Sequence, residues 1–237
     1  MLQALTPRPA TDYTASGFQR MTSSDPARWR ALCLGALALF LVLSAGAALG
    51  TLPGDVAVRA LVRGYVGSEA GPFFHGVNHG GTWMVLLPAT ALLFALSPHA
   101  RRRWWLWCAV LVLAPNIENG WKVLVGRTRP EGHAFGFPSG HATATAAYVV
   151  SALYLLGRGP FGRAGRVATS VVVVVVLGVG VGAARLALDA HWLSDVVGGW
   201  ALGAACASGA AWWDASREAT AHAPPAAPGR LERRTVD

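Results

Sequence analysis

The sequence is poor in charged residues. Asp, Glu, Lys and Arg make up 14% of its 237 residues, whereas about 25% is usual in soluble proteins. Several stretches of roughly 20 residues carry no charged side chain, and a helix of that length crosses the ~30 Å hydrocarbon core of a bilayer. The scarcity of charge therefore disfavours a soluble protein and indicates an integral membrane protein.

Cysteines are also scarce. Cys33, Cys108 and Cys206 lie far apart within apolar stretches, with no CxxC pair and no histidine at ligand-like spacing. This pattern disfavours a disulfide framework and metal ligands, and it is typical of small buried hydrophobic residues. The sequence also lacks an HExxH motif and clustered carboxylates, so we expect no metal and no other cofactor.

Acidic residues are fewer than basic ones, which gives a formal net charge of +8. In a soluble protein this excess would suggest nucleic-acid binding. Here most arginines fall between apolar segments, and no basic stretch has interleaved aromatic residues. The charge is better explained by orientation in a bilayer, and no nucleic-acid partner is expected.

Six apolar segments are expected to form the transmembrane helices of an all-α bundle. They cover residues 31–54, 76–96, 104–125, 141–157, 167–184 and 191–213. Residues 31–213 thus form one domain, and the polar segments 1–30 and 214–237 are expected to be disordered cytoplasmic tails. The polar link 55–69 is a candidate amphipathic surface segment. A cleaved signal peptide is the alternative for the first span, but its apolar run is too long.

The arginines predict the orientation of this bundle. With six spans both termini lie on one side, and fourteen arginines fall on that side, whereas only six basic residues fall on the other. By the positive-inside rule the arginine-rich side is cytoplasmic in the cell (plasma or inner) membrane. The other side, which holds the motifs described next, is therefore extracytoplasmic.

The turn Phe137-Pro138-Ser139-Gly140-His141 precedes the fourth span. Ser139 can cap the helix, Gly140 allows close approach of a ligand to the backbone, and the free N–H groups of a helix start favour an anion. His141 would then lie beside the bound anion. The alternative is an ordinary helix start with an interfacial histidine.

Three cations, Lys122, Arg129 and Arg185, lie at the outer ends of the third and fifth spans. Such residues bind the oxygens of a phosphate group. Alternatively, each extends to the lipid headgroups, which is the favoured interpretation for Arg127. Lys122 also has Glu118 four residues earlier, which allows an ion pair on the helix surface.

His191 and Asp195 are four residues apart, on one face of a helix. The carboxylate can hold the imidazole in one tautomer and make its other nitrogen a nucleophile. In this interpretation His191 attacks phosphorus, and His141 acts as general acid and then as base for water. A structural hydrogen bond is the alternative.

These residues resemble the three signature motifs of the PAP2 (type 2 phosphatidic acid phosphatase) superfamily. The motifs are Lys122-(six residues)-Arg129-Pro130, Pro138-Ser139-Gly140-His141, and Arg185-(five residues)-His191-(three residues)-Asp195. Their order and spacing agree over Lys122 to Asp195, and the six-span layout is similar to the membrane branch of the superfamily. Soluble vanadate-dependent haloperoxidases share the motifs, but six apolar spans argue against that branch.

The resemblance implies a metal-independent phosphatase that works through a phosphohistidine. His191 would be the nucleophile, Asp195 its orienting partner and His141 the acid and base. The phosphoryl oxygens would be held by Lys122, Arg129, Ser139, Gly140 and Arg185. One departure is Ala184, which stands where the third motif usually has Ser and removes one hydroxyl donor. Asp189 adds a negative charge near His191 that either disfavours an anionic substrate or holds a cation.

By this resemblance the expected substrate is a lipid-linked phosphate or diphosphate in the outer leaflet. Polyprenyl diphosphate, such as the undecaprenyl diphosphate of cell-envelope synthesis, ranks first, followed by phosphatidic acid or phosphatidylglycerophosphate. The alternative is a non-catalytic protein that binds or transports anionic lipids. The sequence leaves open the oligomeric state and the role of three polar residues at membrane depth, Asn116, Glu118 and Asn119.

Overall fold

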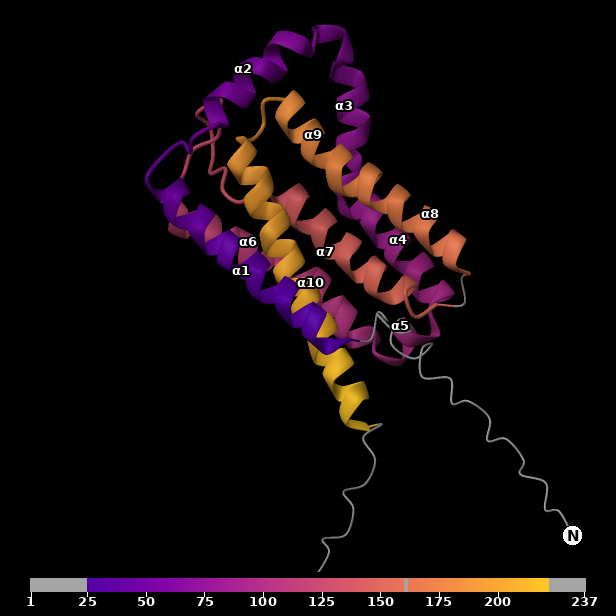
Figure 1. The fold of residues 1–237 in the computed structure, drawn as a ribbon. Coiled ribbons are helices and arrows are strands. Elements are labelled where there is room, and N and C mark those ends of the chain that lie inside the picture. The colour runs from indigo at the N-terminus through magenta and orange to yellow at the C-terminus, as the bar shows by residue number, and fades with distance from the viewer. Residues whose placement is uncertain (1–24, 160–161, 222–237) are drawn as a thin grey trace, which may run out of the picture.

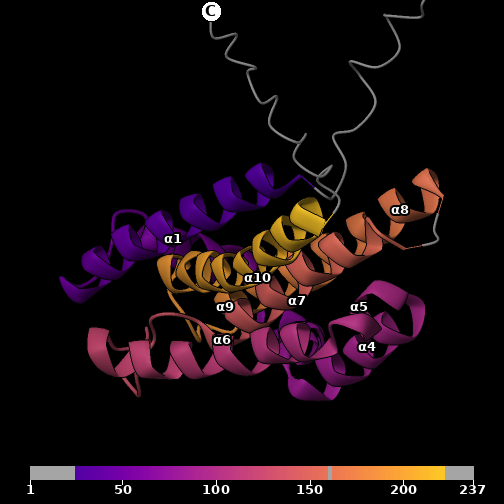
Figure 2. The same cartoon turned by 90° about the horizontal axis from the view of Figure 1, so that it is seen from below.

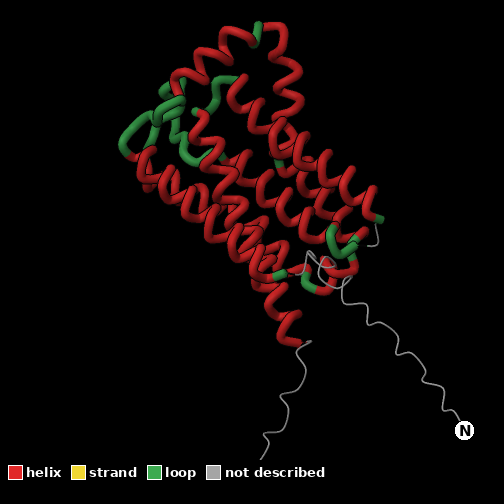
Figure 3. Tube along the Cα trace, viewed as in Figure 1, coloured by secondary structure: helices red, strands yellow, loops and turns green. Residues whose placement is uncertain are grey.

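The chain forms a bundle of helices (Figures 1 and 3). The computed structural model describes residues 25–159 and 162–221. Within these ranges there is no strand, and an isolated bridge joins Thr128 to Phe135 in the loop that precedes the Pro138-containing turn. The all-helical prediction is therefore confirmed.

The predicted apolar segments lie largely in helical stretches, although the first extends beyond the end of its helix at Ala48 and the last begins two residues before its helix. These are α1 (Pro26–Ala48), α3 (Gly71–Asn78) with α4 (Trp83–Leu96), α6 (Trp104–Val125), α7 (Gly140–Leu156), α8 (Arg163–Val173) continued through a π-helical turn (Val174–Gly180) into α9 (Val181–Ala187), and α10 (Leu193–Ala221). Two short helices, α2 (Asp55–Tyr65) and α5 (Pro98–Arg102), join them, with single 3-10 turns at Ser68–Ala70 and His79–Gly81.

Two helical stretches in the described residues are long and apolar enough to cross a membrane, Pro26–Ala48 and Arg163–Ala187. The bent pair Gly71–Gly81 and Trp83–Leu96, with 48° between its parts, makes a third if it acts as one span. Many apolar side chains on these helices are exposed, as at Val42 (69%). An apolar surface of this extent needs a lipid environment, which supports a membrane protein, and the count of six spans stays a prediction.

Helix α10 packs at the centre of the bundle. In Figure 2, α10 and α7 lie between α1 on one side and α4, α5 and α6 on the other. Gly199 and Gly203 of α10 face α7, where a Cβ added at Gly203 would collide with the carbonyl oxygen of Thr143. Small residues four apart let two membrane helices approach closely. This contact fixes the start of α7 against the start of α10, where two of the predicted motifs lie.

The polar tails were predicted to end at residue 30 and to begin again at residue 214, and both of these boundaries are wrong. Helix α10 continues to Ala221 because Asp214, fully buried, accepts a hydrogen bond from Tyr154 Oη (2.6 Å) and contacts His99 Nε2 (2.5 Å). Helix α1 begins at Pro26 because Asp25 caps it, with Oδ1 accepting from the backbone N–H of Ala27 (2.9 Å). The rest of the predicted tails, residues 1–24 and 222–237, lies outside the described residues.

His99, Asp214 and Glu218 bring together ligand atoms of a kind that could hold a metal ion. The guanidinium of Arg103 already forms an ion pair with Asp214, with Nε 2.8 Å from Oδ1. A positive charge at that position opposes a bound cation. We therefore interpret this cluster as an ion-pair network that ties α5 and α7 to the end of α10.

The two ends of the bundle differ in chemistry. The start of α1, helix α5 and the end of α10 lie together at one end, and α2 with the loops before α7 and α10 lies at the opposite end (Figure 1). The arginine cluster Arg101–Arg103 thus lies at the opposite end of the bundle from the histidine motifs. This separation is the arrangement that the charge pattern predicts.

We expect Gly203→Ala to destabilise the protein by about 1–3 kcal/mol, because the added methyl overpacks the contact between α10 and α7. The measurement is the thermal unfolding temperature of the purified protein in detergent. Gly209→Ala is the matched control on the same helix, since its Cβ would meet only Cys33 Sγ at 3.4 Å. Equal unfolding temperatures for the two variants would contradict the proposed close packing.

Candidate active site

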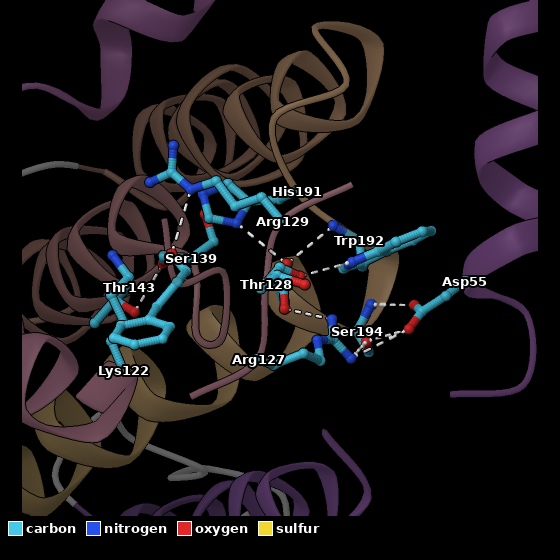
Figure 4. Close-up of polar contacts among 12 residues, drawn as sticks. Asp55, Lys122, Arg127, Thr128, Arg129, Ser139, Thr143, His191, Trp192 and Ser194 are labelled. Atoms are coloured by element: carbon cyan, nitrogen blue, oxygen red, sulfur yellow. Dashed lines mark hydrogen bonds and ion pairs between the residues drawn. The ribbon is translucent and has the colours of Figure 1, made fainter. Parts of the chain in front are cut away.

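The motif residues gather at one end of the bundle, around the loop 126–139 and the turn between α9 and α10 (Figure 4). His141 lies close enough to His191 for the charges of the two imidazoles to interact. The three predicted cations, Lys122, Arg129 and Arg185, are also close enough to His141 for such interactions. The structure thus brings together side chains that are up to 69 positions apart in the sequence.

His191 and Asp195 form the predicted pair. Nδ1 of the imidazole lies 3.2 Å from Oδ2 of the carboxylate, and the two residues are 4% and 0% exposed. An ionised carboxylate at this position places the proton on Nδ1, so the lone pair is on Nε2.

The local structure differs from the predicted one, because His191 precedes α10 instead of lying within it. Asp195 lies in the first turn of α10, and its Oδ2 also accepts from the backbone N–H of Trp192 (3.0 Å). This is the reciprocal half of a capping box. One carboxylate therefore both starts the helix and orients the imidazole.

Arg127 contacts the other oxygen of Asp195, so the prediction that it extends to lipid headgroups is wrong. Only 7% of Arg127 is exposed, and its Nη2 forms a short ion pair with Asp195 Oδ1. Its Nη1 donates to Ser194 Oγ (2.9 Å) and lies 3.3 Å from Asp55 Oδ2. The cause is the positive φ of 66° at Gly126, which ends α6 and turns the chain inward.

Asp55 is a second buried carboxylate that the motifs did not predict. It is 1% exposed at the start of α2, and it accepts from Ser194 N (2.9 Å), Ser194 Oγ (2.7 Å) and Leu52 N (2.9 Å). Figure 4 shows Arg127 and Ser194 both reaching it. The polar contacts thus run from His191 through Asp195 and Arg127 to Asp55.

The turn before α7 is held against the same helix. The backbone N–H of Ser139 donates to the carbonyl oxygen of Asp195 (2.9 Å). Ser139 precedes α7 but its hydroxyl makes no capping bond, and this buried Oγ has no partner in the described part of the chain. A free hydroxyl beside the first N–H groups of a helix suits an anion.

Arg185 and Arg129 are held by neutral acceptors. Arg185 is 8% exposed and donates from Nη1 to Asn78 Oδ1 (2.9 Å), while its Nε has no acceptor in the described residues. Arg129 donates from Nε to the carbonyl oxygen of Phe135 (3.3 Å). Asn78 on α3 therefore positions Arg185, a contact that no motif predicted.

Lys122 forms the predicted ion pair with Glu118. The pair is not on the helix surface, because Glu118 is only 3% exposed. Asn116 and Asn119 are exposed, and Asn116 Nδ2 donates to the carbonyl oxygen of Val112 (2.7 Å). Of the three polar residues in this part of α6, Glu118 alone is buried at the site.

Asp189 is neutralised by α2. Its two carboxylate oxygens accept from Nε and Nη2 of Arg59, each at 2.7 Å, and Arg63 lies 3.6 Å away. The hydrogen bond with Arg59 holds the pKa of Asp189 below its usual range. Arg59 also lies over the ring of Trp192, 5.3 Å from its centroid. Of the two roles left open for Asp189, the structure supports neither and gives it a role in fastening α2.

An apolar cavity of 390 Å³ opens beside the site, between α4, α6 and α7. Its lining includes Gly81, Trp83 and Ala144. Gly81 also packs against the side chain of His141, since a Cβ at Gly81 would lie 2.8 Å from both Cβ and Cδ2 of His141. A hydrocarbon chain in this cavity would therefore end near His141.

The sequence is similar to a known protein family and to two named phosphatases. A family model described as the PAP2 superfamily matches residues 103–218. The chain is 30% identical over 137 residues to phosphatidylglycerophosphatase B of Bacillus subtilis, which covers 54% of this chain and 67% of that protein. It is 34% identical over 168 residues to decaprenylphosphoryl-5-phosphoribose phosphatase of Mycobacterium tuberculosis, which covers 64% of this chain and 85% of that protein.

A solved structure has the same fold. It is the crystal structure of the transmembrane PAP2 type phosphatidylglycerolphosphate phosphatase from Bacillus subtilis, with a TM-score of 0.64 and 23% identity over 82% of this chain and 98% of that one. Together with the matched family model and the curated relatives, the motifs and their geometry establish that this chain belongs to the PAP2 superfamily and is a membrane phosphatase.

Proposed function

We propose that this phosphatase hydrolyses the phosphate of a lipid through a phosphohistidine on His191, without a metal ion. The observation that supports the proposal most directly is the buried His191–Asp195 pair close to His141. The cations Lys122, Arg129 and Arg185 lie around His141, and an apolar cavity opens beside it. The cations suit the phosphate and the cavity suits the hydrocarbon chain. The donor set around the site is cationic, so it favours an anion over a metal ion.

In the first step Nε2 of His191 attacks phosphorus, and the bond from phosphorus to the leaving oxygen breaks. His141 donates a proton to that oxygen. In the second step His141 takes a proton from water, the water oxygen attacks the phosphohistidine, and the bond between nitrogen and phosphorus breaks to release phosphate. Lys122, Arg129 and Arg185 stabilise the charge on the phosphoryl oxygens in both steps.

The substrates to compare are polyprenyl diphosphate, phosphatidic acid and phosphatidylglycerophosphate. The resemblance to the PAP2 superfamily and the predicted topology rank polyprenyl diphosphate first. The printed names of the two curated relatives instead specify a phosphatidylglycerophosphatase and a phosphatase of a 5-phosphoribose lipid. Both names specify an enzyme that acts on a terminal phosphate monoester. We therefore consider lipid phosphate monoesters and polyprenyl diphosphate equally good candidate substrates.

The proposed placement in the membrane has six spans over residues 31–213, with both termini in the cytoplasm. The site then lies at the extracytoplasmic surface, and a lipid enters sideways from the outer leaflet into the cavity lined by Gly81 and Trp83. The arginine-rich end of the bundle supports this orientation.

We expect wild-type protein in detergent micelles with EDTA to release phosphate from at least one of the three lipids. His191→Ala should lose about 10³-fold or more of this rate, because it removes the nucleophile. His141→Ala should lose about 10²- to 10⁴-fold, because the leaving oxygen is no longer protonated and water is no longer activated. His133→Ala is the matched control, an exposed histidine of the same loop region. Equal phosphate release from wild type and His191→Ala would refute the proposal.

Arg127→Gln should reduce kcat with little change in KM, because Arg127 positions Asp195 and does not touch the substrate. The variant also leaves two buried carboxylates without their cation, so we expect a loss of stability of about 3–5 kcal/mol. The measurements are steady-state kinetics below the unfolding temperature and thermal unfolding in detergent. Arg63→Gln is the control, since its side chain is 64% exposed and makes only a long ion pair. Unchanged kcat and stability in Arg127→Gln would show that its contacts are dispensable.

Reporter fusions test the orientation. A fluorescent protein that folds only in the cytoplasm should be bright when fused after Asp237. An alkaline phosphatase that folds only outside the cytoplasm should be active when inserted at Gly132, an exposed position in the loop before α7. The reverse pattern would place the site in the cytoplasm.

A further inference from the structure

Glu118 is a buried carboxylate that the mechanism above does not use. It lies on α6 with 3% of its surface exposed, and its Oε1 forms a short ion pair with Lys122 Nζ. Lys122 is the one partner of Oε1 in the described residues. A buried charge with so little support is costly, which raises the question of what it does.

The carboxylate of Glu118 lies against the first residue of α7. A Cβ added at Gly140 would be 3.1 Å from Oε1, 3.2 Å from Cδ and 3.2 Å from Oε2. Gly140 begins α7, where the backbone N–H groups and the unpaired hydroxyl of Ser139 suit an anion. A negative side chain therefore stands at the edge of a site that is otherwise built for a negative ligand.

This position changes the charge that the site offers. Lys122, Arg129 and Arg185 bring three positive charges to His141, and Glu118 cancels one of them through Lys122. A phosphate monoester carries about −1.5 to −2 charges at neutral pH. A diphosphate carries more, so it would meet the same carboxylate with a larger repulsion.

We propose that Glu118 is a specificity-determining residue, which lowers the positive charge of the phosphate site to match a terminal phosphate monoester and disfavours a diphosphate. The inference rests on the proposed phosphate site of Lys122, Arg129 and Arg185. It deepens the proposed function by naming the substrate class, a lipid that ends in a monoester.

The test measures binding of orthophosphate and of inorganic diphosphate to the purified full-length protein in detergent micelles, by titration calorimetry. Glu118→Gln should bind diphosphate about tenfold more tightly than wild type, which corresponds to ~1.4 kcal/mol, and orthophosphate by a smaller factor. The preference for diphosphate over orthophosphate therefore rises. Glu131→Gln is the matched control, because it removes the same charge from an exposed residue of the neighbouring loop.

An unchanged preference in Glu118→Gln would overturn the proposal. Weaker binding of both anions would also overturn it, because Glu118 would then serve only to hold Lys122 in place. Glu118→Ala removes the same charge with a smaller side chain, and it gives the same two outcomes if the Gln variant does not fold.

The two proposals can fail separately. Anion binding needs no turnover, so a protein that hydrolyses no lipid phosphate but shows the shifted preference refutes the lipid phosphatase and keeps the role of Glu118. Hydrolysis of a lipid phosphate with no shift in the Glu118 variants refutes the role of Glu118 alone.

Discussion

The site depends on the burial of one negative charge, the carboxylate of Asp195. Buried carboxylates are stable only when each oxygen has donors, and the donors of this one come from two separate parts of the chain. His191 and the N–H of Trp192 contact one oxygen, and Arg127 contacts the other. The need to satisfy this carboxylate therefore brings the loop after α6 against the start of α10. The imidazole is oriented as a consequence of the same arrangement.

The relative position of His141 and His191 depends on a second feature, the close packing of the α7 and α10 backbones. Gly199 and Gly203 let α7 lie against α10 with no side chain between them, and Ser139 bonds to the backbone of Asp195. His141 in the first turn of α7 and His191 before α10 thus take their positions from one helix contact. Helices with larger residues at this contact would lie farther apart, and so would the two histidines.

The sequence predicted what depends on composition and local spacing. Apolar length predicted the helices. The three motifs, through their resemblance to those of the PAP2 superfamily, predicted which residues gather. It did not predict Arg127, Asp55 or Asn78, since their partners lie far along the chain and are chosen by how loops fold over one another. The end of α10 was missed for the same reason. Asp214 and its neighbours look like a polar tail until Tyr154 and His99 are seen beside them.

The partners of the basic residues separate structural cations from those available to a ligand. Arg127 and Arg59 contact carboxylates, so their charge is already compensated within the protein. Arg129 and Arg185 contact only neutral oxygens in the described residues, and their charge stays uncompensated although Arg185 is buried. An uncompensated buried cation is costly unless an anion arrives, so the site is most stable when occupied. Lys122 lies between the two groups, and its carboxylate partner sets how much charge is left for the substrate.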